Sequence, residues 1–151
     1  MPAVSQLGSI LGAAQAALAG LSLTPAVPVV VVARLPYARE GRDELPLFLV
    51  APLRPESSEP WTSEDQALVR YRVVIALVAA GDHALGASGL DNFLGWREKA
   101  RKLFQFGCPG VSSVLLTELR DGDPIDVQMV AEGYDYSALP LTFWNIEARA
   151  A

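Results

Sequence analysis

Apolar residues recur at helical spacing in the first part of the chain. They stand at Leu7, Ile10, Leu11, Ala14, Leu18 and Leu21, and Ser5 precedes them at a plausible N-cap position. The opposite face of this predicted helix carries small residues in place of charged ones, and no charged side chain precedes Arg34. The pattern fits a helix packed on its own sheet, and it equally fits a helix shared between two subunits.

Two apolar runs follow, "VPVVVVARL" and "LPLFLVAPL", and the charged stretch "PYAREGRDE" separates them. Runs of this length that are rich in β-branched residues predict strands. Together the two runs predict a long hairpin with an exposed tip at 36–45. The polar, proline-containing and acidic segment 54–66 is expected to be a mobile loop.

The segment "ALVRYRVVIALVAA" predicts a long strand with Tyr71, Val73 and Ile75 on one face, and its far half is apolar on both faces. The next segment, "LDNFLGWREKARKLFQF", predicts a second helix that starts with Ser88 and Asp91 at capping-box spacing and stops near Gly107. Its expected buried stripe consists of Leu90, Phe93, Leu94, Ala100, Leu103 and Phe104. Glu98 and Lys102 on its wet face are spaced for an ion pair.

Three strands are expected near the end of the chain, with a corner around Ser137 between the last two. In the final strand Leu139, Leu141 and Phe143 alternate on one side, as in a half-buried strand. Trp144 and Ile146 lie on the other side, where a monomer normally faces water. Such a strand needs two neighbours, which are provided either by the domain itself or by another chain. Trp144 and Ile146, with Leu7 and Leu11 of the first helix, are therefore the candidates for domain or subunit packing.

The order of these elements predicts the fold class. The strands cluster and do not alternate regularly with helices, which favours an α+β domain over a doubly wound parallel sheet. We expect one domain over residues 1–151, with a mainly antiparallel sheet that contains the long hairpin and is packed by two helices.

Composition narrows the classes of function. The chain of 151 residues carries a formal charge of -5, which argues against coating nucleic acid but suits a surface past which DNA slides. The only cysteine is Cys108 and the only histidine is His83, so neither an internal disulfide framework nor a Cys/His zinc site is expected. The first helix contains polar residues and lacks a basic start, so neither a membrane span nor a secretory signal is expected.

No pattern for catalysis emerges. His83 beside Asp82 resembles a general base, but Cys108 is the only thiol nucleophile available and is expected to be a small buried residue. Asp121, Asp123 and Asp126 lack the spacing of a calcium loop and are expected to form turns. We therefore expect a binding or structural protein, not an enzyme, with no metal and no cofactor.

Three segments resemble those of a known protein family. They are the strand "VRYRVVIALVAAGD", the helix "LGWREKARKLF" and the ending "GYDYSALPLTFWNIEAR". In the amino-acid sequence of these segments and in the order of its elements, the chain resembles the tail-terminator and tail-completion proteins of long-tailed bacteriophages, which join head and tail at the neck. This resemblance implies a small α/β virion protein, assembled in the host cytoplasm, that forms a ring, typically a hexamer, on the tail tube. Its partners would be the tail-tube protein and the head-tail connector protein, with DNA passing through the channel without sequence-specific binding.

On this resemblance, two exposed segments are expected to contact tube or connector proteins. The residues concerned are Glu40, Arg42 and Glu44 at the hairpin tip and Trp61 and Glu64 in the acidic loop. Two alternatives stay open at this point. One is a tail-tube or other neck subunit, and the other is a small intracellular enzyme or ligand-binding domain with an apolar pocket between sheet and helices.

Overall fold

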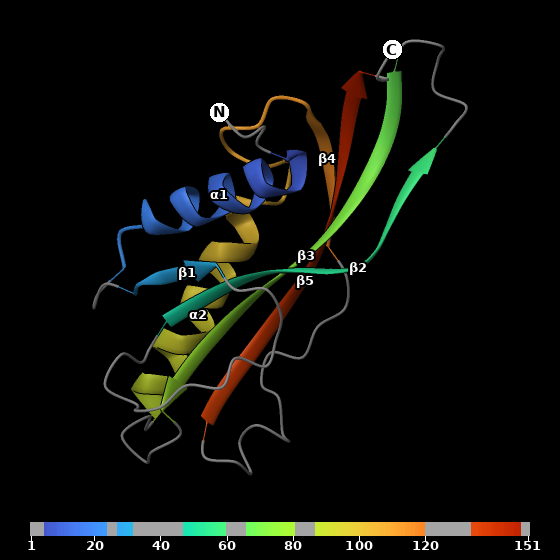
Figure 1. The fold of residues 1–151 in the computed structure, drawn as a ribbon. Helices are drawn as coiled ribbons and strands as arrows, with labels where there is room; N and C mark the ends of the chain where they lie inside the picture. The colour runs from blue at the N-terminus through green and yellow to red at the C-terminus, as the bar shows by residue number, and fades with distance from the viewer. Residues whose placement is uncertain are drawn as a thin grey trace.

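The computed structural model describes residues 5–23, 27–31, 47–59, 66–80, 87–119 and 134–148, and everything below concerns these residues. They form two helices and one sheet of five strands (Figure 1). The elements are α1 (Gln6–Ala19), β1 (Val29–Val31), β2 (Leu47–Glu59), β3 (Gln66–Ala80), α2 (Ala87–Leu103), β4 (Val114–Leu119) and β5 (Tyr134–Ala148). The predicted α+β class, with a mostly antiparallel sheet packed by two helices, is confirmed.

The strand order is β1-β2-β3-β5-β4, so that β3 lies at the centre of the sheet. β3 pairs with β5 in antiparallel register along its whole length, from Gln66 opposite Ala148 to Ala80 opposite Tyr134. It also pairs in antiparallel fashion with β2. Because side chains alternate across a strand, this long register decides which residues of the sheet face the helices.

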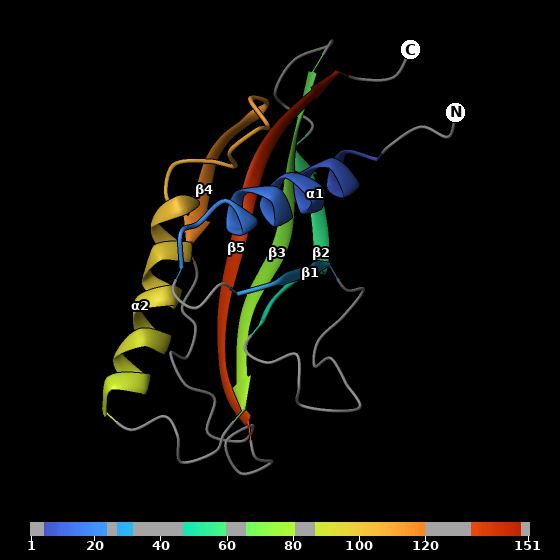
Figure 2. The same cartoon turned by 90° about the vertical axis from the view of Figure 1, so that its left-hand side faces the viewer.

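Both helices lie on the same face of the sheet (Figure 2). α1 crosses the strands and lies near β1 and β2, whereas α2 runs alongside β5. On this helix-covered face β3 contributes Tyr71, Val73, Ile75 and Leu77 to the main core, and β5 contributes Leu139, Leu141 and Phe143. The predicted alternation of both strands is therefore confirmed.

α1 begins as its sequence predicts. The Ser5 side chain accepts a hydrogen bond from the backbone amide of Gly8 at 2.9 Å, which satisfies one of the free donors of the first turn. Ile10, Ala14 and Leu18 recur four residues apart and are fully buried against the sheet. Gln15 Nε2 donates to the carbonyl of Val29 at 3.1 Å, so that the helix is also tied to β1 by a hydrogen bond.

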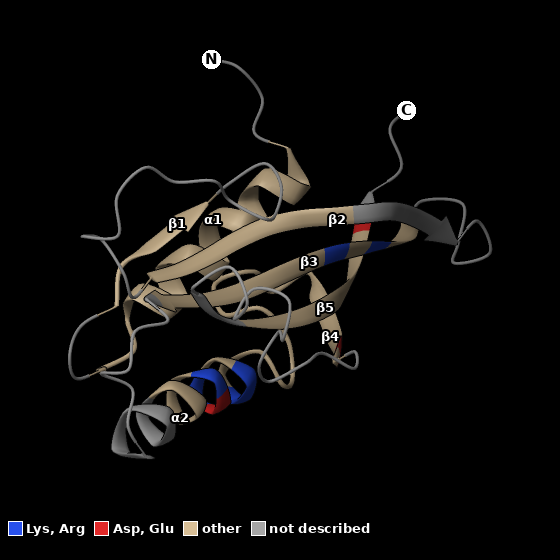
Figure 3. Ribbon diagram, turned by 90° about the horizontal axis from the view of Figure 1, so that it is seen from below, with Lys and Arg blue, Asp and Glu red and all other residues tan. Residues whose placement is uncertain are grey.

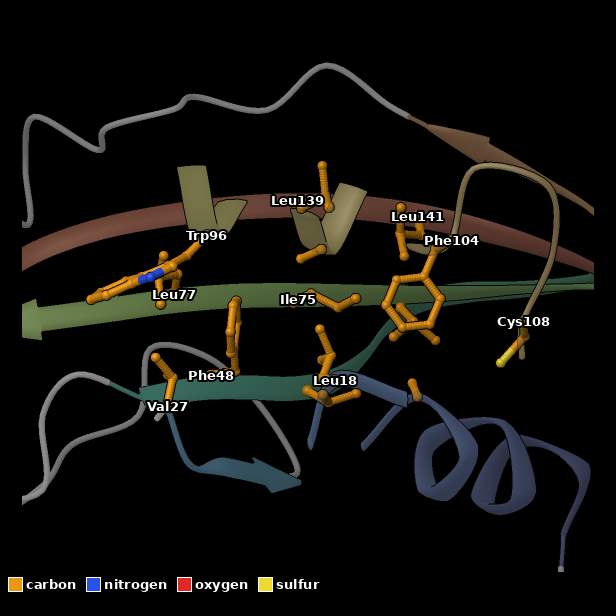
Figure 4. Packing of buried hydrophobic residues seen from close by; sticks show 14 of the residues in the cluster. Leu18, Val27, Phe48, Ile75, Leu77, Trp96, Phe104, Cys108, Leu139 and Leu141 are labelled. Atoms are coloured by element: carbon orange, nitrogen blue, oxygen red, sulfur yellow. The ribbon is translucent and has the colours of Figure 1, made fainter. Parts of the chain in front are cut away.

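α2 packs an aromatic face on the sheet (Figure 4). Phe93, Trp96, Ala100 and Phe104 are buried, and the ring of Phe104 meets Phe143 edge to face at 6.0 Å and 64°. The predicted buried stripe did not include Trp96. Its indole has a large apolar body and a polar tip, and in the sequence it stands next to the basic residues of the exposed face. The Leu94 and Leu103 side chains are only partly buried at the margin of the core.

A tight turn follows α2 and returns the chain toward the sheet. The Val111 amide donates to the Cys108 carbonyl at 3.0 Å, with Pro109 and Gly110 between them. Gly110 has φ +85°, a conformation that glycine adopts without strain, and Pro before such a glycine is typical of a type II turn. A side chain at Gly110 would approach the Cβ of Ala13 at 3.8 Å, which places this turn against α1.

The predicted hairpin between the first two apolar runs is wrong. β1 pairs with β2 in parallel, with Val29 opposite Phe48, and residues 32–46 provide the long connection that a parallel pair requires. The long hairpin is formed instead by β2 and β3. The predicted tip 36–45 lies outside the described residues.

The predicted loop 54–66 is wrong for its first half, because β2 continues to Glu59. An irregularity between Leu53 and Ser57 accommodates Pro55, after which Ser57 pairs with Arg70. Residues 60–65 are outside the described part of the chain. The polar, proline-containing sequence predicted a loop, because no local pattern indicates that this segment pairs with β3.

Two further boundaries differ from prediction. Ser137 forms no corner, because β5 runs through it in pairing with Leu77, and its side chain is buried at 2% exposure. Residues 134–136 of the predicted fifth strand belong to β5, and residues 126–133 are not among those described. α2 starts at Ala87, so Ser88 stands inside the helix and not at its cap.

We predict that Phe143→Ala lowers the free energy of unfolding by about 3–5 kcal/mol, because it removes a fully buried ring and its edge contact with Phe104. Urea denaturation of dilute protein measures the change. Phe106→Ala is the matched control, since Phe106 is 85% exposed, and it should change the stability by less than about 0.5 kcal/mol. Equal effects of the two substitutions would contradict the core described above.

Candidate interaction surface

The described residues offer no site for metal chemistry, because no group of three or more His, Cys, Asp or Glu lies close enough among them to hold an ion. Neither α1 nor α2 is long and apolar enough to cross a membrane. His83, Asp82, Asp121, Asp123 and Asp126 lie outside the described residues.

Cys108 is buried, as the sequence predicts, with its sulfur 4.0 Å from the carbonyl oxygen of Ile10. Burial disfavours the charged thiolate and raises the pKa of the Cys108 thiol to about 11. A protonated thiol beneath α1 is a poor nucleophile at neutral pH. The residue thus acts as a small apolar side chain of the core.

The face of the sheet opposite the helices is divided into two parts. In one part Leu47, Leu49, Ala76 and Val78 form a second, smaller buried cluster. In the other part, half-buried and exposed side chains surround the buried Leu68 and Thr142. We call this second part the open-face patch, and it consists of Leu53, Arg70, Arg72, Leu116, Trp144 and Ile146.

Strand register brings the members of the open-face patch together. Arg72 pairs with Leu53 on β2 and with Thr142 on β5. One step along, Trp144 pairs with Arg70 on β3 and with Leu116 on β4. The patch therefore extends across four neighbouring strands, and Leu53 and Leu116 at its sides are 40% and 45% exposed.

Trp144 is the centre of this surface. The guanidinium carbon of Arg70 lies 4.9 Å from the centroid of the Trp144 ring, within the range of a cation–π interaction. The Trp144 Nε1, Arg72 Nε and Thr142 Oγ1 atoms are buried, and none has a hydrogen-bond partner among the described residues.

A second exposed apolar region adjoins the patch at β4, which is the outermost strand and pairs with β5 alone among the described strands. We call it the β4 edge and define it as Phe106, Leu115, Leu116 and Leu119. Their side chains are 85%, 55%, 45% and 36% exposed, respectively. A side chain at Gly107 would lie 3.7 Å from the Val114 carbonyl, which places Phe106 beside the start of β4. Exposed apolar side chains gathered in this way are typical of a site of association between chains.

The basic side chains drawn in Figure 3 fall into two separate groups. Arg70 and Arg72 lie on β3 within the open-face patch, whereas the other basic group lies on α2. There the predicted ion pair is confirmed, with Lys102 Nζ 2.9 Å from Glu98 Oε1. The hydrogen bond from Lys102 lowers the pKa of Glu98. The α2 charges thus form a solvated face, and those on β3 adjoin apolar groups.

The structure separates the four residues that the sequence predicts for packing. Leu7 and Leu11 are partly buried and pack against the main core, so they serve the domain itself. Trp144 and Ile146 lie together on the opposite side of the sheet, in the open-face patch. The predicted partner-contact residues Glu40, Arg42, Glu44, Trp61 and Glu64 lie outside the described residues.

Sequence reasoning missed the β4 edge and the role of the two arginines. The consecutive Leu115 and Leu116 in "VLLTEL" were a usable signal, because adjacent apolar residues in a strand point to opposite faces. Phe106 gave no signal, since it follows a helical stripe that ends in Phe104. The contact between Arg70 and Trp144 depends on the register of β3 and β5, which no local pattern specifies.

Comparison with known proteins gave no match to any protein family model and no similar sequence among the curated proteins.

We predict that iodoacetamide alkylates Cys108 far more slowly in the folded protein than in urea. The folded pKa of about 11 exceeds the unfolded value near 9.0, so the thiolate fraction at pH 8 is about 100-fold lower on these grounds alone. The associated stability is complete below pH 9 and is lost as the pH rises toward 11. Mass spectrometry over time measures the rates, and equal rates in both states would show that Cys108 is accessible.

Proposed function

We propose that this protein is a non-enzymatic structural subunit that assembles into a ring at the head-proximal end of a phage tail, where it ends tube polymerisation and joins the tail to the head connector. Two independent lines support the proposal. One is the likeness of the long strand, the second helix and the final strand to tail-terminator and tail-completion proteins. The other is the open side of the sheet.

The observation that carries the proposal is the partly exposed region on the second face of the sheet. α1 and α2 cover one face, and the open-face patch on the other presents a half-buried tryptophan with two arginines and exposed leucines. Trp and Arg are the residues most enriched at the energetic centres of protein interfaces. A ring also requires two different surfaces on every subunit, and the open-face patch is proposed as one of them.

The remaining parts of the proposal follow from the resemblance. The partners are the tail-tube protein and the connector protein, with Glu40, Arg42, Glu44, Trp61 and Glu64 as the proposed contacts. The net charge of -5 suits a channel through which DNA passes, because an acidic wall does not retain phosphate. The proposed location is the virion neck, after assembly in the host cytoplasm.

Light scattering across a concentration series, followed by negative-stain imaging of the large species, tests the function. Closed rings of uniform size are the expected result. Open tubes would favour a tail-tube subunit instead, and a protein that remains monomeric at every concentration would contradict ring formation. The neighbouring genes provide a second test, because capsid, connector and tape-measure genes are expected and metabolic genes would oppose a virion role.

We predict that Trp144→Glu abolishes ring assembly, because it replaces the apolar centre of the open-face patch with a charge. An interface anchor contributes about 2 kcal/mol or more, so association should weaken by at least about 30-fold. Size-exclusion chromatography with light scattering measures assembly, and circular dichroism verifies the fold. Lys99→Glu on the exposed face of α2 is the control and should assemble like the parent. Rings formed by Trp144→Glu at parental concentrations would show that the patch is not the interface.

A further inference from the structure

We infer that one flank of α2 binds the phosphate backbone of double-stranded DNA. We call it the basic flank and define it as Arg97, Arg101 and Lys102, whose side chains are half-buried or exposed (Figure 3). It lies on the helix-covered side of the sheet, away from the open-face patch. The inference goes beyond the proposed function, because the basic flank belongs to a single subunit and its binding does not require the ring.

The basic flank carries more positive charge than the described acidic side chains neutralise. Glu98 pairs with Lys102 at 2.9 Å, whereas Arg97 and Arg101 form no ion pair with a described acidic residue. The two arginines are four residues apart, a spacing at which like charges repel in a helix. Burial, followed by repulsion from Arg101, lowers the pKa of Arg97. A bound polyanion would remove this repulsion.

The charge of α2 contrasts with that of the whole chain. The chain has a formal charge of -5, but α2 from Phe93 to Leu103 carries four basic residues and one acidic residue, a net charge of +3 (4 − 1). The basic residues are Arg97, Lys99, Arg101 and Lys102. Basic side chains clustered along one helix are typical of a surface that contacts phosphate.

The chemistry of the basic flank favours DNA over an acidic protein surface. The apolar residues beside it, Leu94 and Leu103, pack against the main core, while the side chains of Glu98 and Lys102 are 55% and 62% exposed. Protein interfaces have an apolar centre, whereas protein–DNA interfaces are more polar and much more positively charged. A guanidinium also donates two parallel hydrogen bonds to the oxygens of one phosphate.

The spacing of the arginines is compatible with one DNA strand. Residues four apart in a helix are about 6 Å apart along its axis, and every second phosphate of a DNA strand advances about 7 Å. Arg97 and Arg101 can therefore contact phosphates of the same strand. Phosphate contacts carry no sequence information, and two or three of them bind weakly at physiological salt. Such a contact allows DNA of any sequence to pass without being retained.

Fluorescence anisotropy of a labelled DNA duplex, titrated with the full chain at several salt concentrations, tests the inference. Arg97→Gln with Arg101→Gln should weaken binding by at least about 10-fold in low salt and reduce the slope of log affinity against log salt by about 2. Glu98→Gln removes the negative charge beside the basic flank and should tighten binding.

A matched pair of single variants tests the position of the contact. Arg101→Gln and Lys99→Gln each remove one charge from the same helix, but the two residues lie about 160° apart around its axis. Only Arg101→Gln should reduce the salt slope by about 1. Arg101→Lys keeps the charge and should retain most of the slope, which separates an effect of charge from an effect of packing. Circular dichroism verifies that each variant is folded.

The outcomes separate this inference from the proposed function, because light scattering of the same samples records the rings. Failure of the parent to bind DNA in low salt, or undiminished binding by Arg97→Gln with Arg101→Gln, would overturn the inference and leave the ring proposal standing. Tighter binding of the parent to polyglutamate than to DNA would overturn it in favour of an acidic protein partner. DNA binding by a chain that never forms rings would support the inference and contradict the proposed function.

Discussion

The pairing of β3 with β5 along their entire length is the interaction on which the rest of the structure depends. It fixes Tyr71, Val73 and Ile75 on the same face as Leu139 and Leu141, and this face binds both helices. Since side chains alternate along a strand, the same register necessarily brings Arg70 over Trp144 on the opposite face. A slip of one residue would exchange the two faces, so the core and the open-face patch are specified together.

The two faces are stabilised in different ways. On the helix-covered face, burial of large side chains such as Phe48, Phe93, Phe104 and Phe143 provides the main driving force for folding. On the other face, Trp144 remains half-buried and its indole nitrogen has no partner within the described part of the chain. The domain can therefore fold around its main core and still present apolar and basic side chains to a neighbour. This difference between the two faces of the sheet is the physical basis of the proposed ring.

Local periodicity accounts for most of what could be predicted from the sequence. The stripe of α1, its Ser5 cap and the alternation of Val73 or Phe143 are local, and the structure confirms them. The parallel pairing of β1 could not be predicted, because a run of valines has no direction. Ser137 was misread as a corner since a serine in a buried strand looks like a turn former. Trp144 was predicted on the second face, but its contact with Arg70 depends on long-range register.

Fluorine NMR of protein labelled with 5-fluorotryptophan is the measurement that most directly tests whether the open face becomes an interface. The chain has three tryptophans, and Trp→Phe variants assign their signals. A soluble paramagnetic agent reports the accessibility of each ring across a dilution series. The account predicts that Trp144 becomes protected as the protein assembles, while Trp96, buried in the main core, does not change. Assembly that leaves the accessibility of Trp144 unchanged would contradict it.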